Sequence, residues 1–557
     1  MQKKKPEGTK STLKINQANI FHNYTIGFES SHIDLLKTAK NLLKTGLTKA
    51  VFFSDFRYIY SDKQKQIKMN WIQPQGRQWD SSWQIQFDAE VPTSIATELT
   101  QAIQAAFQEQ RIIGSGSSQI APYIIASLPP IVLELDEVSL SLFASVKLFE
   151  DGIAILSFQY DAAWEGIDEI DFISNIVNLY QRYFKSIWVD SRIQRYDAEE
   201  LLPFAFQEEL SIAGNSIVNW KTKRLLRKMR KESRQTLNKA LDQQGQIFNI
   251  GNEEWILHEI AGSKEVDSWE STMDLCRSEY TNTLCRLVAS GRNKKIPKKQ
   301  LDYVWEGRPS VTLMRFLDQP STKIDLLSRF GPSLSRILMR SPSVNIPLEL
   351  PQDLRSFGDY CFHGNRAMLL YTWIKHPEAP ADAWNDKETF SALMEDQARA
   401  EHAEYLNMRI VRACRWAQFP PSVGHLREAY ATLAFTEDMI QRSSQSGEVS
   451  EALAYLMEKF GTLKLVSSAK ETARWHLDEL GYESDRSRNR MNRWIAFVFG
   501  LVGTAGLADF AIQPNLEAIC PDLKHEAVPI VAFGIAIVAV LLITLVIWGV
   551  NKIKTDN

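Results

Sequence analysis

The chain has 557 residues, a length that predicts several domains, and a formal net charge of −3. Its charged content of 24% and hydrophobic content of 44% are typical of a globular protein, and the near-neutral balance excludes a globally basic nucleic-acid-binding protein. No nucleic-acid duplex is therefore expected as a partner. The five cysteines form no CxxC pair, which excludes a disulfide framework or a zinc knuckle.

The first part of the chain predicts a short tail followed by an α/β domain. Residues 1–12 are basic and lack an apolar stretch, so they predict a disordered tail rather than a signal peptide. In the domain expected at 13–190, two strand-like segments, 138–149 and 153–161, flank a turn signal at 150–152 and predict a β-hairpin. Further strands are predicted at 49–62 and 82–91, and capped helices at 92–110 and 168–188.

The next block, 191–390, predicts a mixed and mostly helical insert that contains a basic helix. Residues 221–240 carry nine basic side chains and one acid, Glu232, around an apolar stripe at helical spacing. This helix would bind a phosphorylated small-molecule ligand or anionic lipid, and the alternative is a solvated face balanced by acidic residues elsewhere. The candidate binding residues are Lys221, Lys223, Arg224, Arg227, Lys228, Arg230 and Lys231.

Residues 357–373 combine His363, Asn365 and Arg366 with several aromatic side chains. That combination is compatible with a ligand pocket and with a packed core segment, and the sequence leaves both open. No enzyme signature is recognised, since the glycine-rich segment 114–118 lacks the Lys-Ser/Thr pair of a phosphate-binding loop. The protein is therefore not expected to be an enzyme.

Residues 391–490 predict a helical stalk. Helices are predicted at about 387–418 and 422–442, and a third begins near residue 450, where apolar residues recur at three- and four-residue spacing. If this third helix continued to about residue 494, it would be roughly 65 Å long. Gly461 and Gly481 are the positions at which it would bend.

Residues 491–557 predict a two-helix transmembrane hairpin with a basic tail. The 24 uncharged residues 527–550 would extend roughly 36 Å, enough to cross a bilayer, and the shorter run 494–508 would span only by continuing to about Ile512. A buried amphipathic helix is the alternative for that first run. Basic residues flank the hairpin, so both termini are expected in the cytosol and the protein in the cytoplasmic membrane as a multi-pass protein.

Small residues dominate the first run, and Asp509 lies at its end. Small faces let helices approach closely in lipid, and a ring of carboxylates in an oligomer would attract cations. The alternative is that Asp509 begins the outer loop in water. The candidate ion-path residues are Gly500, Gly503, Thr504, Gly506 and Asp509, and Asp509 is also the candidate metal-binding residue.

The two predicted spans, the acidic loop and the basic tail resemble the CorA-type family of two-transmembrane cation transporters. The first span of that family ends in Gly-Met-Asn-Phe, followed by a proline. Here the corresponding residues are 507–510, so that Phe510 and Pro514 form the outer motif, while the other three motif residues are replaced. The resemblance implies a pentamer and Mg²⁺ or another divalent cation as the transported ion, with no covalently bound cofactor. The replacements imply weaker discrimination among cations.

The sequence therefore predicts an α+β fold with an N-terminal α/β cytosolic domain, a mostly helical middle region, a long stalk helix and a C-terminal two-helix transmembrane hairpin. The expected function is conduction of cations, gated by the cytosolic part, with the lipid bilayer and other copies of the chain as partners. Two alternatives remain open. One is a ligand-triggered membrane effector of nucleotide-signalled defence that permeabilises the membrane, and the other is a non-conducting membrane-anchored scaffold.

Overall fold

The computed structural model places the chain in two compact units, Met1–Glu471 and Thr472–Asn557, and we describe each unit by itself. The residues that the structure describes are 13–30, 32–60, 63–66, 68–72, 82–87, 91–113, 120–135, 139–182, 184–197, 228, 231, 235, 245–251, 253–260, 273–289, 303–342, 349–374, 387–444, 446–482, 508, 512–519 and 527–539.

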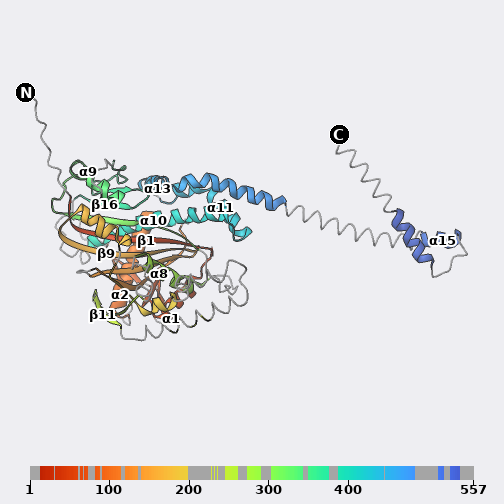
Figure 1. Cartoon of the computed structure of the whole chain (residues 1–557), viewed down its shortest axis with the longest axis horizontal. Helices are drawn as coiled ribbons and strands as arrows, with labels where there is room; N and C mark the ends of the chain where they lie inside the picture. Colours follow the sequence, from red (N-terminus) through yellow and green to blue (C-terminus); the bar gives the residue numbers. More distant parts are fainter. Residues whose placement is uncertain are drawn as a thin grey trace, which may run out of the picture. The chain divides into compact units, whose positions relative to one another are not determined.

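One mixed sheet of 14 strands forms the centre of the first unit (Figure 1). Its strands are β1 (Lys14–Phe28), β2 (Ala50–Phe53), β3 (Arg57–Tyr60), β4 (Lys63–Gln66), β7 (Tyr123–Glu134), β8 (Ser139–Phe149), β9 (Ile153–Asp168), β10 (Ser186–Val189), β11 (Gln246–Ile250), β12 (Glu253–Glu259), β13 (Tyr303–Glu306), β14 (Pro309–Phe316), β15 (Tyr360–Gly364) and β16 (Leu369–Trp373). The main path runs β11-β12-β10-β7-β8-β9-β1-β14-β16-β15, with β2, β3, β4 and β13 as branches. Along this path only β14 and β16 pair in parallel. A separate hairpin joins β5 (Lys68–Ile72) to β6 (Ser82–Gln86).

Helices cover both faces of this sheet. The helices of the first unit include α1 (Leu35–Thr45), α2 (Thr93–Ile113), α4 (Ser191–Asp197), α8 (Met273–Leu287), α9 (Lys323–Met339), α10 (Lys387–Gln418), α11 (Val423–Ala434), α12 (Thr436–Gln441) and α13 (Gly447–Lys459). α1, α8 and α9 pack on the face that carries the even-numbered residues of β1, such as Ile20 and Ile26. α2 and α10 cover the opposite face, and α11 and α13 lie against α10 (Figure 1).

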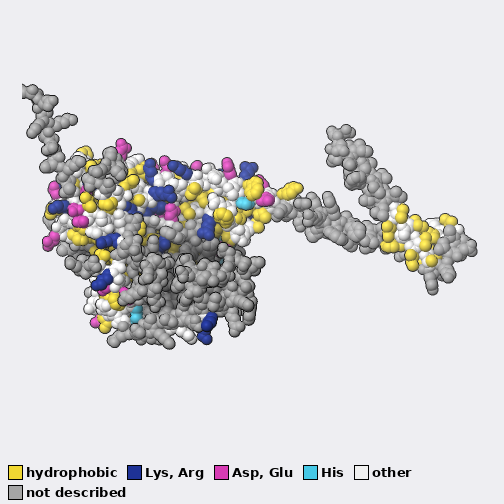
Figure 2. All heavy atoms as spheres, in the orientation of Figure 1, with side chains coloured by type: hydrophobic (Ala, Val, Ile, Leu, Met, Phe, Trp, Pro, Cys, Tyr) yellow, Lys and Arg dark blue, Asp and Glu magenta, His cyan; other side chains and the backbone are white. Residues whose placement is uncertain are grey.

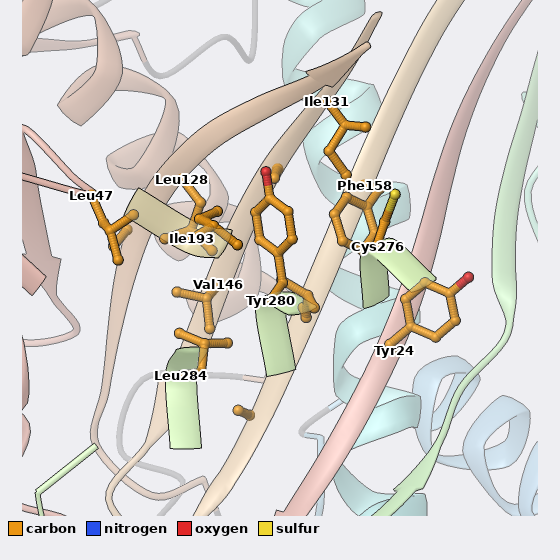
Figure 3. Close-up of a cluster of buried hydrophobic side chains, with 14 of the residues drawn as sticks. Tyr24, Leu47, Leu128, Ile131, Val146, Phe158, Ile193, Cys276, Tyr280 and Leu284 are labelled. Atoms are coloured by element: carbon orange, nitrogen blue, oxygen red, sulfur yellow. The ribbon is translucent and has the colours of Figure 1, made fainter. Parts of the chain in front are cut away.

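The face under α8 and α9 is an apolar core. Tyr280 of α8 lies edge-on to Phe158 of β9, with ring centroids 5.3 Å apart, and both side chains are buried (Figure 3). The Tyr280 hydroxyl donates a hydrogen bond of 2.6 Å to the carbonyl oxygen of Pro129. Burial of each such large apolar side chain contributes about 1.5–3 kcal/mol. A second cluster packs α9 against the sheet through Val311, Leu313, Phe330, Leu334 and Leu370.

Two prolines interrupt β7 in the middle of the sheet. The register between β7 and β8 shifts across Pro129 and Pro130. Before the prolines, residues 124–125 pair with β2, and after them residues 132–134 pair with β10. Because proline has no N–H to donate, it is tolerated in a strand only where no ladder bond is required. The double proline marks the point at which β7 changes its partner and the sheet divides.

The structure confirms several local predictions. β8 and β9 form the expected antiparallel hairpin around residues 150–152, α2 begins within one residue of the predicted helix, and α10 has the predicted bounds of 387–418. The segment 168–188 was predicted as one helix and is not. It holds a short α-helix (α3, Glu169–Phe172), a π-helical turn (η1, Ile173–Val177), a 3₁₀ turn (η2, Leu179–Gln181) and then β10.

The predicted fold class is wrong. The middle region that was expected to be mostly helical contributes the six strands β11–β16, all of which join the same large sheet as β1 and β7–β10. The stalk is also interrupted, because α13 ends at Lys459, Gly461 has a φ of 81°, and a new helix begins at residue 462 and is described to residue 482. The protein is a mixed α/β structure built around one sheet.

The predicted transmembrane hairpin and the predicted multi-pass location in the cytoplasmic membrane are also contradicted. Across the described ranges, no helix is both long and apolar enough to cross a bilayer. In the second unit, residues 528–539 are helical in the described range. Helix α15 (Gln513–Ile519) occupies the predicted outer loop. The remaining parts of the predicted spans, 494–507, 509–511 and 540–550, lie outside the described residues.

Residues 527–539 of the second unit nevertheless expose mostly apolar side chains (Figure 2). Ala508, Ala532 and Ala536 pack together as a small buried cluster. Larger aliphatic side chains of the same helix point outward, and Ile530 is 75% exposed. Residues 527–539 therefore have the apolar composition that the sequence prediction relied on.

Candidate functional site: a buried polar layer under α10

The sheet face under α10 carries polar and charged side chains where a core would ordinarily be apolar. Alternation along β1 directs Asn19, Asn23 and Gly27 toward α10, while their even-numbered neighbours enter the apolar core. The helix supplies a matching stripe at spacings of three and four residues. We call this set the polar layer, and its members are Asn19, Asn23, Glu109, Lys147, Ser157, Glu306, Arg308, Asp396, Gln397, Glu401, Glu404 and Asn407.

Gly27 sets the distance between β1 and α10. A Cβ atom at this position would lie 2.9 Å from Sδ of Met408 and 3.1 Å from Cδ of Arg412. Both contacts are tighter than ordinary van der Waals separation, so the close approach of the helix requires a residue without a side chain. This proximity brings the α10 side chains within hydrogen-bonding reach of the strands.

At one end of the layer, Lys147 of β8 is held between two carboxylates. Its Nζ lies 2.6 Å from Oε1 of Glu109 on α2 and 3.0 Å from Oε2 of Glu401 on α10. Burial lowers the pKa of Lys147, but the two carboxylates outweigh it and raise the pKa overall. The ammonium group is only 4% exposed, so it stays charged and links two helices to the sheet.

At the other end of the layer, Arg308 forms the corresponding centre, in which a cation again pairs with two carboxylates. Its Nη1 donates to Oε1 of Glu404 at 2.7 Å and its Nη2 to Oε1 of Glu306 at 3.3 Å. The guanidinium carbon lies 3.5 Å from the ring centroid of Phe460. Burial raises the pKa of Glu404 to about 7, with Arg308 opposing that rise. Glu404 therefore changes its charge near neutral pH.

Amide side chains extend the hydrogen bonds of the Lys147 centre along the sheet. Oδ1 of Asn23 accepts hydrogen bonds from the Ser157 hydroxyl at 2.7 Å and from Nε2 of Gln397 at 3.0 Å, and Nε2 of Gln397 also donates to Oε1 of Glu401 at 2.9 Å. Nδ2 of Asn23, Oε1 of Gln397 and both amide atoms of Asn19 are buried and have no hydrogen-bond partner among the described residues. Each unmet group costs about 1–3 kcal/mol. The network is thus only partly satisfied, which makes it sensitive to rearrangement.

Asp396 adds a further buried carboxyl group to the layer. Its Oδ2 accepts from the Thr312 hydroxyl and from Nε1 of Trp373, each at 3.3 Å. Burial first, and the neighbouring charge of Glu395 second, raise the pKa of Asp396 well above its usual range. The protonated form of this carboxyl group is therefore favoured more strongly than in a carboxyl group in water.

The layer extends to the start of the helix that leaves the first unit. Nδ2 of Asn407 donates to Oε2 of Glu306 at 2.8 Å, and the Thr462 hydroxyl donates to Oδ1 of Asn407. Thr462 is the first residue of the helix at 462–482 and follows Gly461, the glycine with a φ of 81°. The hydrogen bonds therefore run from Arg308 to the first turn of that helix.

The residues singled out from the sequence lie elsewhere. The predicted ion-path residues Gly500, Gly503, Thr504, Gly506 and Asp509, and the outer-motif residue Phe510, fall outside the described residues, whereas Pro514 lies in α15. Of the predicted basic helix, Lys228 and Lys231 are described as helical and exposed, and Lys221, Lys223, Arg224, Arg227 and Arg230 fall outside the described ranges.

The segment 357–373 forms the hairpin of β15 and β16. His363 is buried in β15, and Oδ1 of Asn365 accepts hydrogen bonds from the backbone N–H groups of Ala367 and Met368 in the turn. The carbonyl oxygen of Arg366 accepts a hydrogen bond from Nε of Arg308. These three residues therefore have different hydrogen-bond partners.

Sequence reasoning missed the polar layer entirely. The only available signal was the run of Gln397, Glu401, Glu404 and Asn407 at three- and four-residue spacing in a predicted helix. That spacing normally indicates a solvated face. Nothing in the sequence indicated that strands far away in the chain would cover these side chains.

Comparison with protein-family models, with curated proteins and with solved structures finds no match to this chain. The resemblance to CorA-type transporters therefore stays an expectation from a few residues. The assignment of function has to rest on the geometry of the polar layer.

Proposed function

We propose that the first unit has a regulatory function. A change of charge or hydrogen bonding in the polar layer changes the stability of the helix at 462–482. This is the signal-triggered class of function among those expected from the sequence. The observation that carries the proposal is the hydrogen-bonded path from Arg308 through Glu306 and Asn407 to Thr462. Buried and partly satisfied networks of this kind suit elements with two alternative arrangements.

The burial of the layer favours regulation over catalysis. The side chains of Lys147, Glu109 and Glu404 are 4% exposed or less, and α10 covers them. A catalytic site requires a concave surface that substrate can enter. A substrate would reach these groups only if α10 moved. Cation conduction and the scaffold role stay predictions from the sequence, and neither is carried by the layer.

A double-mutant cycle in the full-length protein tests the proposal. Thr462→Val removes the last hydrogen bond of the path, and Glu404→Gln removes a charge beside Arg308 without changing its shape. Each variant should accelerate amide hydrogen exchange in residues 462–482 about tenfold, equivalent to about 1.4 kcal/mol. If the path couples them, the double variant should show clearly less than the sum of the two effects.

Thr436→Val is the matched control. Thr436 is also buried, but its hydroxyl donates to the Thr432 carbonyl at the junction of α11 and α12, outside the layer. This variant should leave exchange in residues 462–482 unchanged. Strict additivity of the two effects, or an equal response to the control, would reject the regulatory path.

A further inference from the structure

A second cluster of chemically reactive groups lies on the opposite face of the sheet, beside α9. Cys361 and His363 are two residues apart in β15, so their side chains leave the strand on the same side. Asp353 comes from the segment that precedes the strand. One potential metal-binding atom from each of the three residues lies within 4.8 Å of the other two. Cys361 is fully buried, and His363 is 1% exposed.

The histidine ring is oriented by the backbone. Nδ1 of His363 lies 2.9 Å from the carbonyl oxygen of Pro351 and 3.3 Å from that of Gln352. Because carbonyl oxygens only accept, this nitrogen carries the proton and Nε2 carries the lone pair. Nε2 is buried and has no hydrogen-bond partner in the described part of the chain. Metal-binding histidines characteristically donate their other ring N–H to a backbone carbonyl or carboxylate in this way.

The carboxylate is held in place as well. Oδ1 of Asp353 accepts from the backbone N–H of Phe362 at 2.9 Å and of Arg355 at 3.0 Å, and Oδ2 accepts from Nζ of Lys323 at 2.7 Å. Lys323 also donates to the Arg355 carbonyl at 2.5 Å. The Cys361 thiol also forms a side-chain hydrogen bond with Asp353. The lysine is the one positive group in contact with the cluster among the described residues, and a bound cation would compete with it.

We propose that Asp353, Cys361 and His363 form a binding site for a divalent transition metal of the Zn²⁺ class, with water as a fourth ligand. Thiolate, imidazole and carboxylate are the ligand types that zinc combines in tetrahedral sites. In a tetrahedral site, metal–ligand bonds of 2.0–2.3 Å place the ligand atoms about 3.3–3.8 Å apart. Small side-chain rotations that bring the three ligand atoms about 1 Å closer together would therefore give the required spacing. The ion would displace the thiol proton to solvent and bind the resulting thiolate.

Metal binding at this site would also fix the segment that contacts α13. Arg355, two residues after Asp353, donates from Nη1 to Oε1 of Glu448 in α13 at 2.9 Å and from Nη2 to Oδ2 of Asp359 at 2.7 Å. An ion held by Asp353 would therefore stiffen the attachment of α13 to β15. The metal site does not depend on the regulatory role proposed for the polar layer.

Binding of Co²⁺ to the full-length, chelator-treated protein tests the site. Co²⁺ reports tetrahedral thiolate coordination through its visible absorption and its thiolate-to-metal charge-transfer band. We expect one ion per chain, displaced by Zn²⁺, and an increase in the unfolding temperature with Zn²⁺. Cys361→Ser and His363→Gln should each weaken binding on the order of 100-fold or more.

Cys414→Ser is the matched control, because Cys414 is also buried and free, but lies on α10 away from the cluster. It should leave the Co²⁺ spectrum unchanged. If the variants of the buried Cys361 and His363 do not fold, Asp353→Asn replaces them as the test. Asparagine keeps the size and one accepting oxygen of this more exposed ligand, and the variant should also weaken Co²⁺ binding. The proposal is overturned if the wild-type protein shows no thiolate charge-transfer band, or if the band persists in Cys361→Ser or Asp353→Asn.

Discussion

On the side of α8 and α9 the central sheet is covered by aliphatic and aromatic side chains, whereas on the side of α10 it is covered by ion pairs and amides. The apolar side contributes free energy with little directional preference. The polar side contributes little net free energy, because its attractions offset the cost of removing charges from water. What it adds is a set of directional contacts between α10 and the strands.

The largest effect is expected from removing the cation at one ionic centre, which tests how much net free energy the polar side contributes. Lys147→Met leaves Glu109 and Glu401 buried without a counter-charge. The free energy of unfolding should fall by about 3–5 kcal/mol, measured by urea denaturation. Replacing all three residues together, with Met at 147 and Leu at 109 and 401, should recover most of that loss. If the triple variant is as unstable as the single variant, the ion pairs contribute substantial net stability and the comparison fails.

Acidification probes both faces at once, because each contains a buried histidine. Burial first, with Arg340 for His22 and Lys147 for His402, lowers the pKa of both rings to about 3. A lowered pKa contributes stability that is complete above about pH 6.5 and is lost as the pH falls toward 3. By pH 5 each histidine should have cost about 2 kcal/mol of unfolding free energy.

The variants His22→Gln and His402→Gln isolate these contributions. Each should flatten the decline of the unfolding free energy between pH 6.5 and 5, measured by urea denaturation across that range. Glu404, with its pKa raised to about 7, acts in the opposite direction, because its contribution is lost as the pH rises from about 4.5 to 7. An unchanged slope in either variant would show that the ring is protonated in the native state.

The smallest expected effect concerns the spacing between β1 and α10. Gly27→Ala forces the helix away from the polar layer and should reduce stability by about 1–3 kcal/mol, as overpacking does. Gly331→Ala in α9 is the control, because a Cβ there meets nothing within 4 Å, and alanine should stabilise that helix by about 0.5–1 kcal/mol. Thermal unfolding of both variants measures the difference. Equal and small effects would mean that α10 tolerates a wider separation.

The sequence predicted the parts of the fold that depend on nearby residues. The hairpin at 150–152 has its turn signal between two alternating segments, and α10 ends before a pair of prolines. The prediction of one helix at 168–188 was wrong because long-range strand pairing overrides helical periodicity there. Ser186 and Ile187 pair with Glu134 and Leu133 of β7. The candidate sites depend still more on contacts between residues that are far apart in the sequence. Arg308 and Glu404 are 96 residues apart, and no local pattern connects them.

The double proline in β7 has a consequence for how the protein avoids self-association. A long strand with an open edge offers consecutive N–H and C=O groups to another chain, which is how intermolecular sheets begin. In β7, one edge is divided into two short lengths that pair with β2 and β10, and two of the residues between them, Pro129 and Pro130, have no N–H to offer. The strand β7 can therefore change its partner from β2 to β10 with fewer unpaired N–H groups at which another chain could add a strand.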